Sequence, residues 1–191
     1  MINPLDIVKQ WLEEYEALGV YEPTAAVLCT RSKKSVSSRV VLIRLISEEG
    51  LYFFTNLNSQ KSKDIKYDNN VALNFYFREQ YRQIIIQGTA QPAADVVADE
   101  YFTNRSRNKQ ISAWASKQSH LLNNEEEFTT RIADFEKQFA NQEVKRPDFW
   151  SGYVIIPSFI ELWTEGADRR HTRMCWEKDE IGKWKSFLLY P

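Results

Sequence analysis

The N-terminal stretch has the pattern of an amphipathic helix. Asn3 followed by Pro4 is typical of a helix cap and a first helical residue. Apolar residues then recur at helical spacing, at Leu5, Val8, Trp11, Leu12, Tyr15 and Leu18. Gly19 comes directly after the last of them, where helices commonly end. We therefore expect a helix within residues 1–20.

From Ala25 onward the pattern becomes that of β-strands. Short segments rich in β-branched and aromatic residues alternate with polar turns, as in antiparallel sheets. The predicted strands cover residues 25–30, 38–46, 51–55, 71–77, 83–90, 152–156, 159–165, 173–177 and 184–190. The turn at residues 78–81 is expected to join two of them as a hairpin.

Two further regions favour helices. Residues 56–68 are polar and follow a strand, with Ser59 as a candidate cap. Residues 93–141 are helical in character and carry an apolar stripe at Phe128, Ile132, Phe135 and Phe139. Pro147 ends this second region, because proline cannot continue a helix.

Around eight short strands interrupted by helices predict a mainly β fold of the α+β kind, an antiparallel barrel with flanking helices. Alternating βαβ units and a Gly-rich phosphate loop are both missing from the sequence, which argues against a Rossmann sheet. We expect a single domain over residues 1–191, with an N-terminal helix at 1–20, a helical insertion at 93–141 and C-terminal strands at 150–191.

Composition narrows the class of protein. The chain has 191 residues, of which 43% are apolar, and its net charge of -1 argues against a general nucleic-acid binder. Cys29 and Cys175 lie far apart and form no CxxC pair, so we expect two buried thiols and a reducing, cytoplasmic location. No signal peptide is apparent, and no apolar run approaches the roughly 20 residues of a membrane span.

The most informative local pattern is the alternation of Arg169, His171 and Arg173. On a regular strand these three side chains would share one face. Cationic groups on one face repel one another unless an anion lies among them, so a phosphorylated ligand would suit this position. A lone histidine is usually structural, and His120, which has no such neighbours, is interpreted as a loop residue.

Two other segments could bind anions. Arg39 and Arg44 flank an apolar strand and are expected on opposite faces, either as solvated arginines of the barrel rim or as grips for two different ligands. Thr55, Ser59 and Lys61 lie where a strand ends and a helix begins. This arrangement suits a phosphate, although an ordinary capped helix with a solvated lysine has the same pattern.

Three more positions are open to two interpretations. Tyr101 and Arg105 would share a helix face and could clamp one anion or form a surface stacking pair. Gln83 could read the edge of a flat ring or simply begin a strand. The segment WASKQS, which contains Gln118, could belong to a site or to a helix end. No spacing suits a metal, and no Ser/His/Asp arrangement is evident.

In their order along the chain, these segments resemble the pyridoxine/pyridoxamine 5′-phosphate oxidase family. The strand RVVLIR is similar to the family's RIVLLK, and FFTNxxSxK is similar to YTNxxSRK. Arg82-Gln83, YFxxRxR, WASKQS, PDFWSGY and the closing Wx(5)RxHxR follow in the expected sequence. The resemblance runs nearly end to end. It implies an FMN-binding split β-barrel of Greek-key topology, which forms a homodimer with FMN at the subunit interface.

The resemblance also implies roles for individual residues. Those that would bind FMN, partly from the other subunit, are Arg39, Val40, Val41, Leu42, Phe54, Thr55, Gln60, Lys61, Gln83, Gln118, Ser119, Trp163 and Arg173. Those that would bind the substrate phosphate are Arg44, Tyr101, Arg105 and Lys109. The catalytic pair, Arg169 and His171, would lie over the substrate ring beside the carbon that is oxidised.

The implied activity is the oxidation of pyridoxamine or pyridoxine 5′-phosphate to pyridoxal 5′-phosphate, with oxygen as acceptor and hydrogen peroxide as product. Several positions depart from the family pattern: Arg44 replaces a lysine, Lys109 a serine and Gln60 an arginine, and Leu162, Thr164, Arg170 and Thr172 in the closing motif also differ. The residues expected to bind flavin therefore match the family pattern more closely than those expected to bind the substrate. The alternatives are a paralogue that oxidises another ring-bearing substrate, as the phenazine-biosynthesis oxidases do, and a non-catalytic protein that binds flavin or pyridoxal phosphate.

Overall fold

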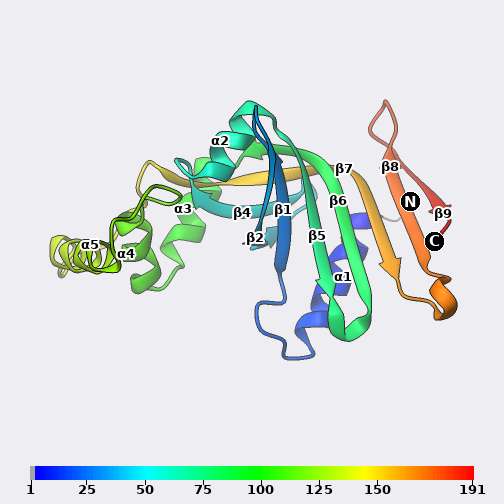
Figure 1. The fold of residues 1–191 in the computed structure, drawn as a ribbon, viewed down its shortest axis with the longest axis horizontal. Coiled ribbons are helices and arrows are strands. Elements are labelled where there is room, and N and C mark those ends of the chain that lie inside the picture. The colour runs from blue at the N-terminus through cyan, green and yellow to red at the C-terminus, as the bar shows by residue number, and fades with distance from the viewer. Residues whose placement is uncertain (1–2) are drawn as a thin grey trace.

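Nine strands form one antiparallel sheet in the computed structural model, which describes residues 3–191 (Figure 1). The strands are β1 (Ala25–Arg31), β2 (Val36–Leu42), β3 (Leu45–Ile46), β4 (Leu51–Asn56), β5 (Asn70–Phe77), β6 (Arg82–Pro92), β7 (Trp150–Thr164), β8 (Thr172–Lys178) and β9 (Trp184–Leu189). Their order in the sheet is β2-β1-β5-β6-β7-β4-β3, and the hairpin of β8 and β9 joins at β7.

The long strand β7 gives the sheet its split form. The first half of β7 pairs with β4, from Trp150 to Ile155, and the second half pairs with β8, from Phe159 to Thr164. The strand β6 runs along β7 on the other side. The sheet also curls back on itself, because the N–H of Arg44, just after β2, donates to the carbonyl of Tyr52 on β4. The expected antiparallel split barrel is thus confirmed.

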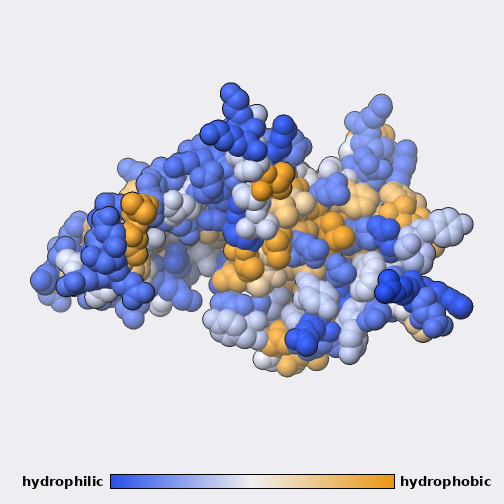
Figure 2. All heavy atoms as spheres, viewed as in Figure 1, coloured by the Kyte–Doolittle hydropathy of each residue, from blue (hydrophilic) through white to orange (hydrophobic). Residues whose placement is uncertain are grey.

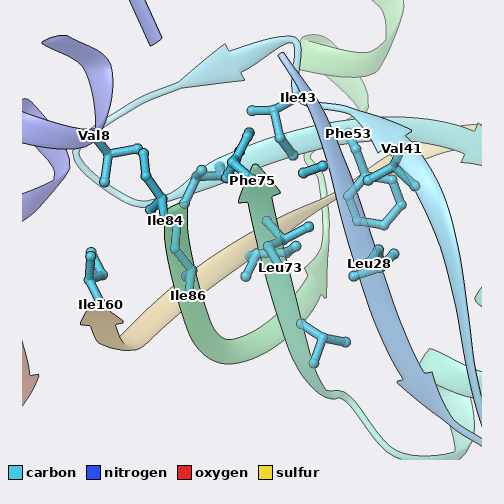
Figure 3. Packing of buried hydrophobic residues seen from close by; sticks show 14 of the residues in the cluster. Val8, Leu28, Val41, Ile43, Phe53, Leu73, Phe75, Ile84, Ile86 and Ile160 are labelled. Atoms are coloured by element: carbon cyan, nitrogen blue, oxygen red, sulfur yellow. The ribbon is translucent and has the colours of Figure 1, made fainter. Parts of the chain in front are cut away.

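The N-terminal helix α1 (Pro4–Glu16) closes one side of the barrel core, and Asn3 caps it as predicted. Its apolar stripe is buried because Val8 packs near Ile84 among residues of β1, β2, β4, β5, β6 and β7 (Figure 3). Polar contacts fix the helix to the start of β6, where Arg82 pairs with Glu14 and lies over the Trp11 ring. These contacts anchor the hairpin of β5 and β6, whose turn is the short helix η1 (Arg78–Gln80).

The remaining helices are α2 (Gln60–Tyr67), α3 (Asp95–Thr103), α4 (Arg107–Ala115), α5 (Glu125–Gln138) and the short η2 (Ala167–Arg169). Helices α4 and α5 extend to one side of the barrel, opposite the hairpin of β8 and β9 (Figure 1). A second apolar cluster holds them together and includes Phe102, Ile111 and Trp150. Since Trp150 begins β7, this cluster links the helices to the sheet.

Several predicted boundaries differ from the structure. The expected strand over 38–46 is interrupted at Ile43 and Arg44, where the pairing changes from β1 to β4: the N–H of Ile43 still donates to the carbonyl of Thr24, but that of Arg44 donates to the carbonyl of Tyr52. The segments 152–156 and 159–165 belong to the single strand β7, which passes through Pro157 at a bulge beside Gly88. The helical region 93–141 comprises three helices rather than one continuous stretch.

The outer face of β1 and β2 is apolar yet exposed. Figure 2 shows apolar atoms over these strands, and the exposed side chains include Val27, Val36 and Val40. Cys29 is half-buried in the same strand β1, so the prediction of a buried thiol is wrong there and right only for Cys175. Exposure of alternate positions along β1 is what leaves Cys29 accessible.

Candidate active site

A cavity of about 380 Å³ lies where β2, β4, α2, α3 and α4 meet. Eleven of the residues that the sequence assigned to a flavin or substrate site line it: Val40, Val41, Leu42, Arg44, Phe54, Thr55, Lys61, Tyr101, Arg105, Lys109 and Gln118. Glu22 and Trp150 complete the lining. Glu22 and Trp150, which lie 128 positions apart in the chain, thus meet at the same cavity.

Lys61 is a buried cation in this cavity. Its Nζ donates to Thr55 Oγ1 at 3.1 Å and to Gln118 Oε1 at 3.2 Å, and its side chain is 8% exposed. Within residues 3–191 no carboxylate lies close enough to pair with it. Burial, together with the neighbouring charge of Arg39, lowers the pKa of Lys61 to about 8. A buried ammonium with neutral partners is suited to an anionic ligand.

The start of α2 lies beside Lys61. Ser59 is the N-cap residue, as the sequence predicted, but its side chain makes no capping hydrogen bond in the structure. Its hydroxyl instead lies 3.2 Å from that of Ser62. Helix N-termini attract anions through their unpaired N–H groups, so this end of the cavity has both charge and donors.

Arg39 lies behind this end of the cavity, away from its lining. Its guanidinium donates to the carbonyl of Leu28 at 3.1 Å and to Thr30 Oγ1 at 2.6 Å, and it pairs with Asp64 at 3.6 Å. Gln60 also reaches Asp64, at 2.7 Å. The interpretation of Arg39 as a solvated rim residue is therefore wrong, since the side chain is tied into a polar cluster.

Three parallel aromatic rings form one wall of the cavity. Phe54 and Tyr101 stack with centroids 4.0 Å apart, and Trp150 lies parallel to Phe54 at 5.7 Å. Gly152 makes this arrangement possible, because a Cβ there would lie only 2.7 Å from a ring carbon of Phe54. A wall of parallel rings suits a flat ligand.

Arg105 lies against this wall. Its guanidinium is 4.7 Å from the centroid of the Trp150 ring, and no carboxylate within residues 3–191 pairs with it. Burial lowers the pKa of Arg105, and the charge of Arg44 lowers it further. Helix α3 ends at Thr103, so Tyr101 and Arg105 meet at the cavity without sharing a helix face. Their predicted proximity is confirmed, although the predicted helical geometry is wrong.

Arg44 lies near Arg105 but has a partner. Glu22, whose φ of 50° is in the left-handed region, pairs with Arg44 at 3.4 Å. Lys109 is exposed at the cavity and has no ion pair within the described part of the chain. Three cations therefore face one end of a cavity with a single carboxylate, which leaves an excess of positive charge.

A second group of predicted residues lies elsewhere. Gln83, Trp163 and Arg173 are direct neighbours across β6, β7 and β8. His171 stacks on Trp163 with centroids 4.6 Å apart, and its Nδ1 accepts a hydrogen bond from the N–H of Gly166. Figure 1 places β8 on the opposite side of the molecule from α3 and α4, so one chain alone does not bring this group to the cavity.

The predicted cationic face of β8 is wrong in two respects. The strand begins only at Thr172, and Asp168 and Arg169 have left-handed φ values of 54° and 63°, so the alternation does not extend to Arg169. Arg173 is neutralised by Glu161, which accepts from its Nε at 2.6 Å and from its second terminal nitrogen at 2.9 Å. Glu161 lies on the neighbouring strand β7, so the alternation of residues along β8 could not identify it as the partner of Arg173.

Val40 lies between the main cavity and the strand surface that carries Gln83. It lines the main cavity and also a shallower hollow of about 470 Å³ on the outer face of the sheet, together with Val27, Tyr76 and Gln83. Ser119, with a φ of 68°, lines neither and faces a separate hollow beside α5. A flat molecule in the main cavity could thus extend over Val40 toward the outer face.

Sequence reasoning missed Glu22, Asp64 and Trp150. Trp150 lies in the segment PDFWSGY, which carried a resemblance but was given no role. Glu22 and Asp64 have no local signal, because their partners lie 22 and 25 positions away in the chain, at Arg44 and Arg39. Within residues 3–191, no helix is long and apolar enough to cross a membrane, and no group of His, Cys, Asp and Glu could hold a metal.

Comparisons with known proteins agree with this geometry. A family model described as "Pyridoxamine 5'-phosphate oxidase" matches residues 11–139. A second model, "Pyridoxine 5'-phosphate oxidase C-terminal dimerisation region", matches residues 150–191. Proteins named pyridoxine/pyridoxamine 5′-phosphate oxidase are similar to this chain. The one from Pelagibacter ubique is 37% identical over 100% of this chain and 92% of its own, and the one from Wolbachia pipientis wMel is 41% identical over 99% and 88%.

Solved structures give the same result. PhzG from Burkholderia lata 383, in complex with tetrahydrophenazine-1-carboxylic acid, superposes with a TM-score of 0.93 at 29% identity and covers 99% of this chain and 93% of its own. An FMN-binding protein from Nostoc punctiforme shares the fold, with a TM-score of 0.80 at 13% identity and full coverage of both chains. Sequence, fold and cavity together lead to one conclusion: the chain belongs to the pyridoxamine 5′-phosphate oxidase family.

Proposed function

We propose that this chain is an FMN-dependent oxidase that converts pyridoxamine 5′-phosphate or pyridoxine 5′-phosphate to pyridoxal 5′-phosphate, with oxygen as acceptor and hydrogen peroxide as product. Relatives that carry this enzyme's name cover nearly the whole chain. The observation that supports the proposal best is the set of cations Lys61, Arg105 and Lys109, which have no carboxylate partner within residues 3–191, around a cavity with a wall of parallel aromatic rings. A phosphorylated aromatic ring and a flavin phosphate would supply the missing anions.

The residues at the start of α2 fit the phosphate of FMN. Lys61 is buried, no carboxylate in the described part of the chain pairs with it, and Thr55 and Ser59 add hydroxyls beside it. A dianion here would restore the charge balance that burial of Lys61 disturbs. Val41, Leu42 and Phe54 would then line the flavin as apolar neighbours. The chemistry that FMN supplies when bound is acceptance of a hydride from the substrate carbon and transfer of two electrons to oxygen.

The substrate phosphate would be bound by Arg105, Tyr101, Lys109 and Arg44. Arg105 lies over the Trp150 ring and is half-buried, so its side chain is already restricted, which lowers the entropy cost of binding. For Arg44 to contribute, the phosphate would have to compete with Glu22. The role of these residues is to fix the substrate so that the carbon to be oxidised faces the flavin.

A second copy of the chain would complete the site. The match of residues 150–191 to a dimerisation region supports a homodimer. Gln83, Trp163 and Arg173 would then approach the flavin of the partner subunit, and Arg169 and His171 would approach its substrate. The exposed apolar face of β1 and β2 supports this arrangement, because a partner would cover it. The proposed catalytic unit is thus a dimer of the single domain over residues 1–191.

In this site, His171 could hold a proton near the substrate. Its Nδ1 accepts from the Gly166 N–H, so its Nε2 is the ring atom left to donate. Loss of a hydride from the carbon that bears the neutral amine gives a protonated imine, which water hydrolyses to the aldehyde and ammonium. The alcohol substrate instead loses a hydride and its hydroxyl proton, which gives the aldehyde directly. The cation Arg169 beside the ring would favour the anionic substrate.

One specific observation favours a second candidate. The high structural similarity to PhzG, whose structure contains a flat tricyclic carboxylate, suits a cavity walled by parallel rings. A paralogue of this kind would bind a carboxylate through Arg105. A third candidate, a non-catalytic protein that binds flavin or pyridoxal phosphate, uses the same residues without turnover.

Anaerobic mixing tests these candidates. The FMN-loaded protein is mixed with pyridoxamine 5′-phosphate while the visible absorbance of the flavin is followed. Bleaching that reverses in air is the expected result. If the flavin stays oxidised with this substrate but bleaches with tetrahydrophenazine-1-carboxylic acid, the second candidate replaces the proposal. A yellow protein that stays oxidised with both, and with pyridoxine 5′-phosphate, would be the non-catalytic binder.

A further inference from the structure

Asp64 is a fully buried carboxylate behind the proposed flavin-phosphate site. It lies on α2 and is 1% exposed. Its Oδ2 accepts from Thr30 Oγ1 at 2.8 Å and from Ser37 Oγ at 2.9 Å, and its Oδ1 accepts from Gln60 Nε2 at 2.7 Å. Arg39 approaches the same Oδ2 at 3.6 Å. One carboxylate therefore binds side chains from both neighbouring strands and from the first turn of the helix.

The partners of Asp64 lie behind the place where a flavin phosphate would bind. Gln60 and Lys61 are adjacent at the start of α2, and the charge of Arg39 is close enough to lower the pKa of Lys61. Asp64 thus fixes α2, which carries Lys61, against β1 and β2, which carry Thr30 and Arg39. This polar link acts beside the packing of Ile65 in the barrel core, and it is the one that reaches Arg39 and Gln60 directly.

The charges at this position are also set by Asp64. Asp64 balances the charge of Arg39, whereas Lys61 has no carboxylate partner within residues 3–191, which leaves an excess of one positive charge. Gln60 stands where the resembling family has an arginine, and its amide is committed to Asp64. Burial favours the neutral form of Asp64, yet the hydrogen bonds from Thr30, Gln60 and Ser37, with the charge of Arg39, lower its pKa. The carboxylate therefore stays charged at neutral pH.

We propose that Asp64 is a positioning residue that fixes Arg39, Gln60 and the start of α2 around the flavin phosphate, and so determines how strongly this protein prefers FMN to riboflavin. The inference rests on the proposed binding of FMN. It makes an unusual prediction, because removing a negative charge near a phosphate should by Coulomb's law tighten binding. If Asp64 instead positions the phosphate donors, its removal should weaken FMN binding. The direction of the change in Kd therefore distinguishes positioning from simple charge repulsion.

The test compares FMN with riboflavin, which lacks the phosphate. Flavin-free Asp64→Asn is titrated with each, and quenching of flavin fluorescence gives the two dissociation constants. Asp64→Asn keeps the shape of the side chain but turns one acceptor into a donor that faces other donors. We expect the Kd for FMN to rise at least about tenfold, as loss of one charged hydrogen bond predicts, while the Kd for riboflavin changes less than about twofold.

Asp68→Asn is the matched control. Asp68 follows the same helix and carries the same charge, but it pairs with Arg31 at 3.0 Å, away from the cavity. Neither Kd should change in this control. Ser37→Ala is a milder second variant, which removes one hydroxyl between Arg39 and Asp64 and keeps the test valid if Asp64→Asn misfolds. It should raise the Kd for FMN alone, by roughly two- to fivefold.

Three other results of these titrations would contradict the proposed role of Asp64. Equal changes for FMN and riboflavin, or tighter binding of FMN, would overturn the positioning role. A parent protein that prefers FMN, with variants that keep the same preference, would also overturn it while leaving the proposed function intact. A parent protein that binds FMN no better than riboflavin would remove the phosphate site itself, and with it both proposals.

Discussion

The guanidinium carbon of Arg105 lies 4.7 Å from the centroid of the Trp150 ring. This contact supports a half-buried cation that has no carboxylate partner within residues 3–191. An indole face attracts a guanidinium, yet its contribution of about 0.5–2 kcal/mol does not neutralise the charge. An anion that enters the cavity therefore finds a donor group already held in place.

Arg105→Ala should weaken binding of the phosphorylated substrate. A charged hydrogen bond contributes about 1.5–3 kcal/mol, so we expect KM for pyridoxamine 5′-phosphate to rise by about 10- to 150-fold. The FMN content should stay at the parental level, because Arg105 is assigned to the substrate. Steady-state kinetics with pyridoxamine, which lacks the phosphate, provides the comparison. A similar loss with both amines would assign Arg105 a role other than phosphate binding.

Lys61→Ala should release flavin. The ammonium is the buried cation at the proposed phosphate position, so its loss should raise the Kd for FMN by about 10- to 150-fold. Fluorescence titration of the flavin-free protein measures this constant. Lys63→Ala is a suitable control, since Lys63 is exposed on the same helix. Equal affinities of Lys61→Ala and the parent would remove Lys61 from the site.

The affinity for FMN should fall as pH rises above about 8. Burial lowers the pKa of Lys61 to about 8 in the flavin-free protein, and the phosphate binds its charged form. The stability of the flavin-free protein changes with pH in the opposite direction to its affinity for FMN. The unfolded chain binds more protons at Lys61 between pH 8 and the ordinary lysine pKa of 10.5, so this group makes the flavin-free protein more stable as pH rises through that window. Titrations from about pH 6.5 to 9.5 check the first effect, and the decline should be absent in Lys61→Ala.

Complementation between two impaired variants, assayed at a substrate concentration well below the KM of Arg105→Ala, should reveal a shared site. Arg169→Ala should impair turnover more than FMN binding, and Arg105→Ala should impair substrate binding. In a mixed dimer one site has both defects and the other has none. Random assortment of equal amounts should therefore recover about a quarter of the parental activity. Co-expression with two affinity tags, followed by assay of each purified dimer, measures this recovery. Mixed dimers no more active than either variant would place Arg169 in the same subunit's site.

The elements of the fold could be predicted because their patterns are local. The helix before Gly19 and the strands between residues 25 and 90 follow from the spacing of apolar side chains. The convergence of Arg44, Lys61 and Tyr101 on one cavity was implied by the family resemblance, and no periodicity in the chain could have indicated it.

The predicted roles of individual side chains were wrong where a residue far away in the sequence determines the charge or the backbone conformation. Arg173 looked like one of three repelling cations, but Glu161 on the neighbouring strand neutralises it. The left-handed backbone at Asp168 and Arg169 broke the assumed alternation, and neither residue signals this conformation, which non-glycine residues rarely adopt. Asp64 looked like any charge on a polar helix, because Thr30 lies 34 positions earlier in the chain.

The separation of β8 from the cavity has a consequence for how the protein behaves on dilution. If each flavin contacts residues of two chains, cofactor binding and subunit association are linked equilibria. Mass action then requires that FMN strengthen the dimer and that the dimer retain FMN, each by the same factor. A dilute sample would lose cofactor and partner together, so the concentration of the protein becomes one of the conditions that set its cofactor content.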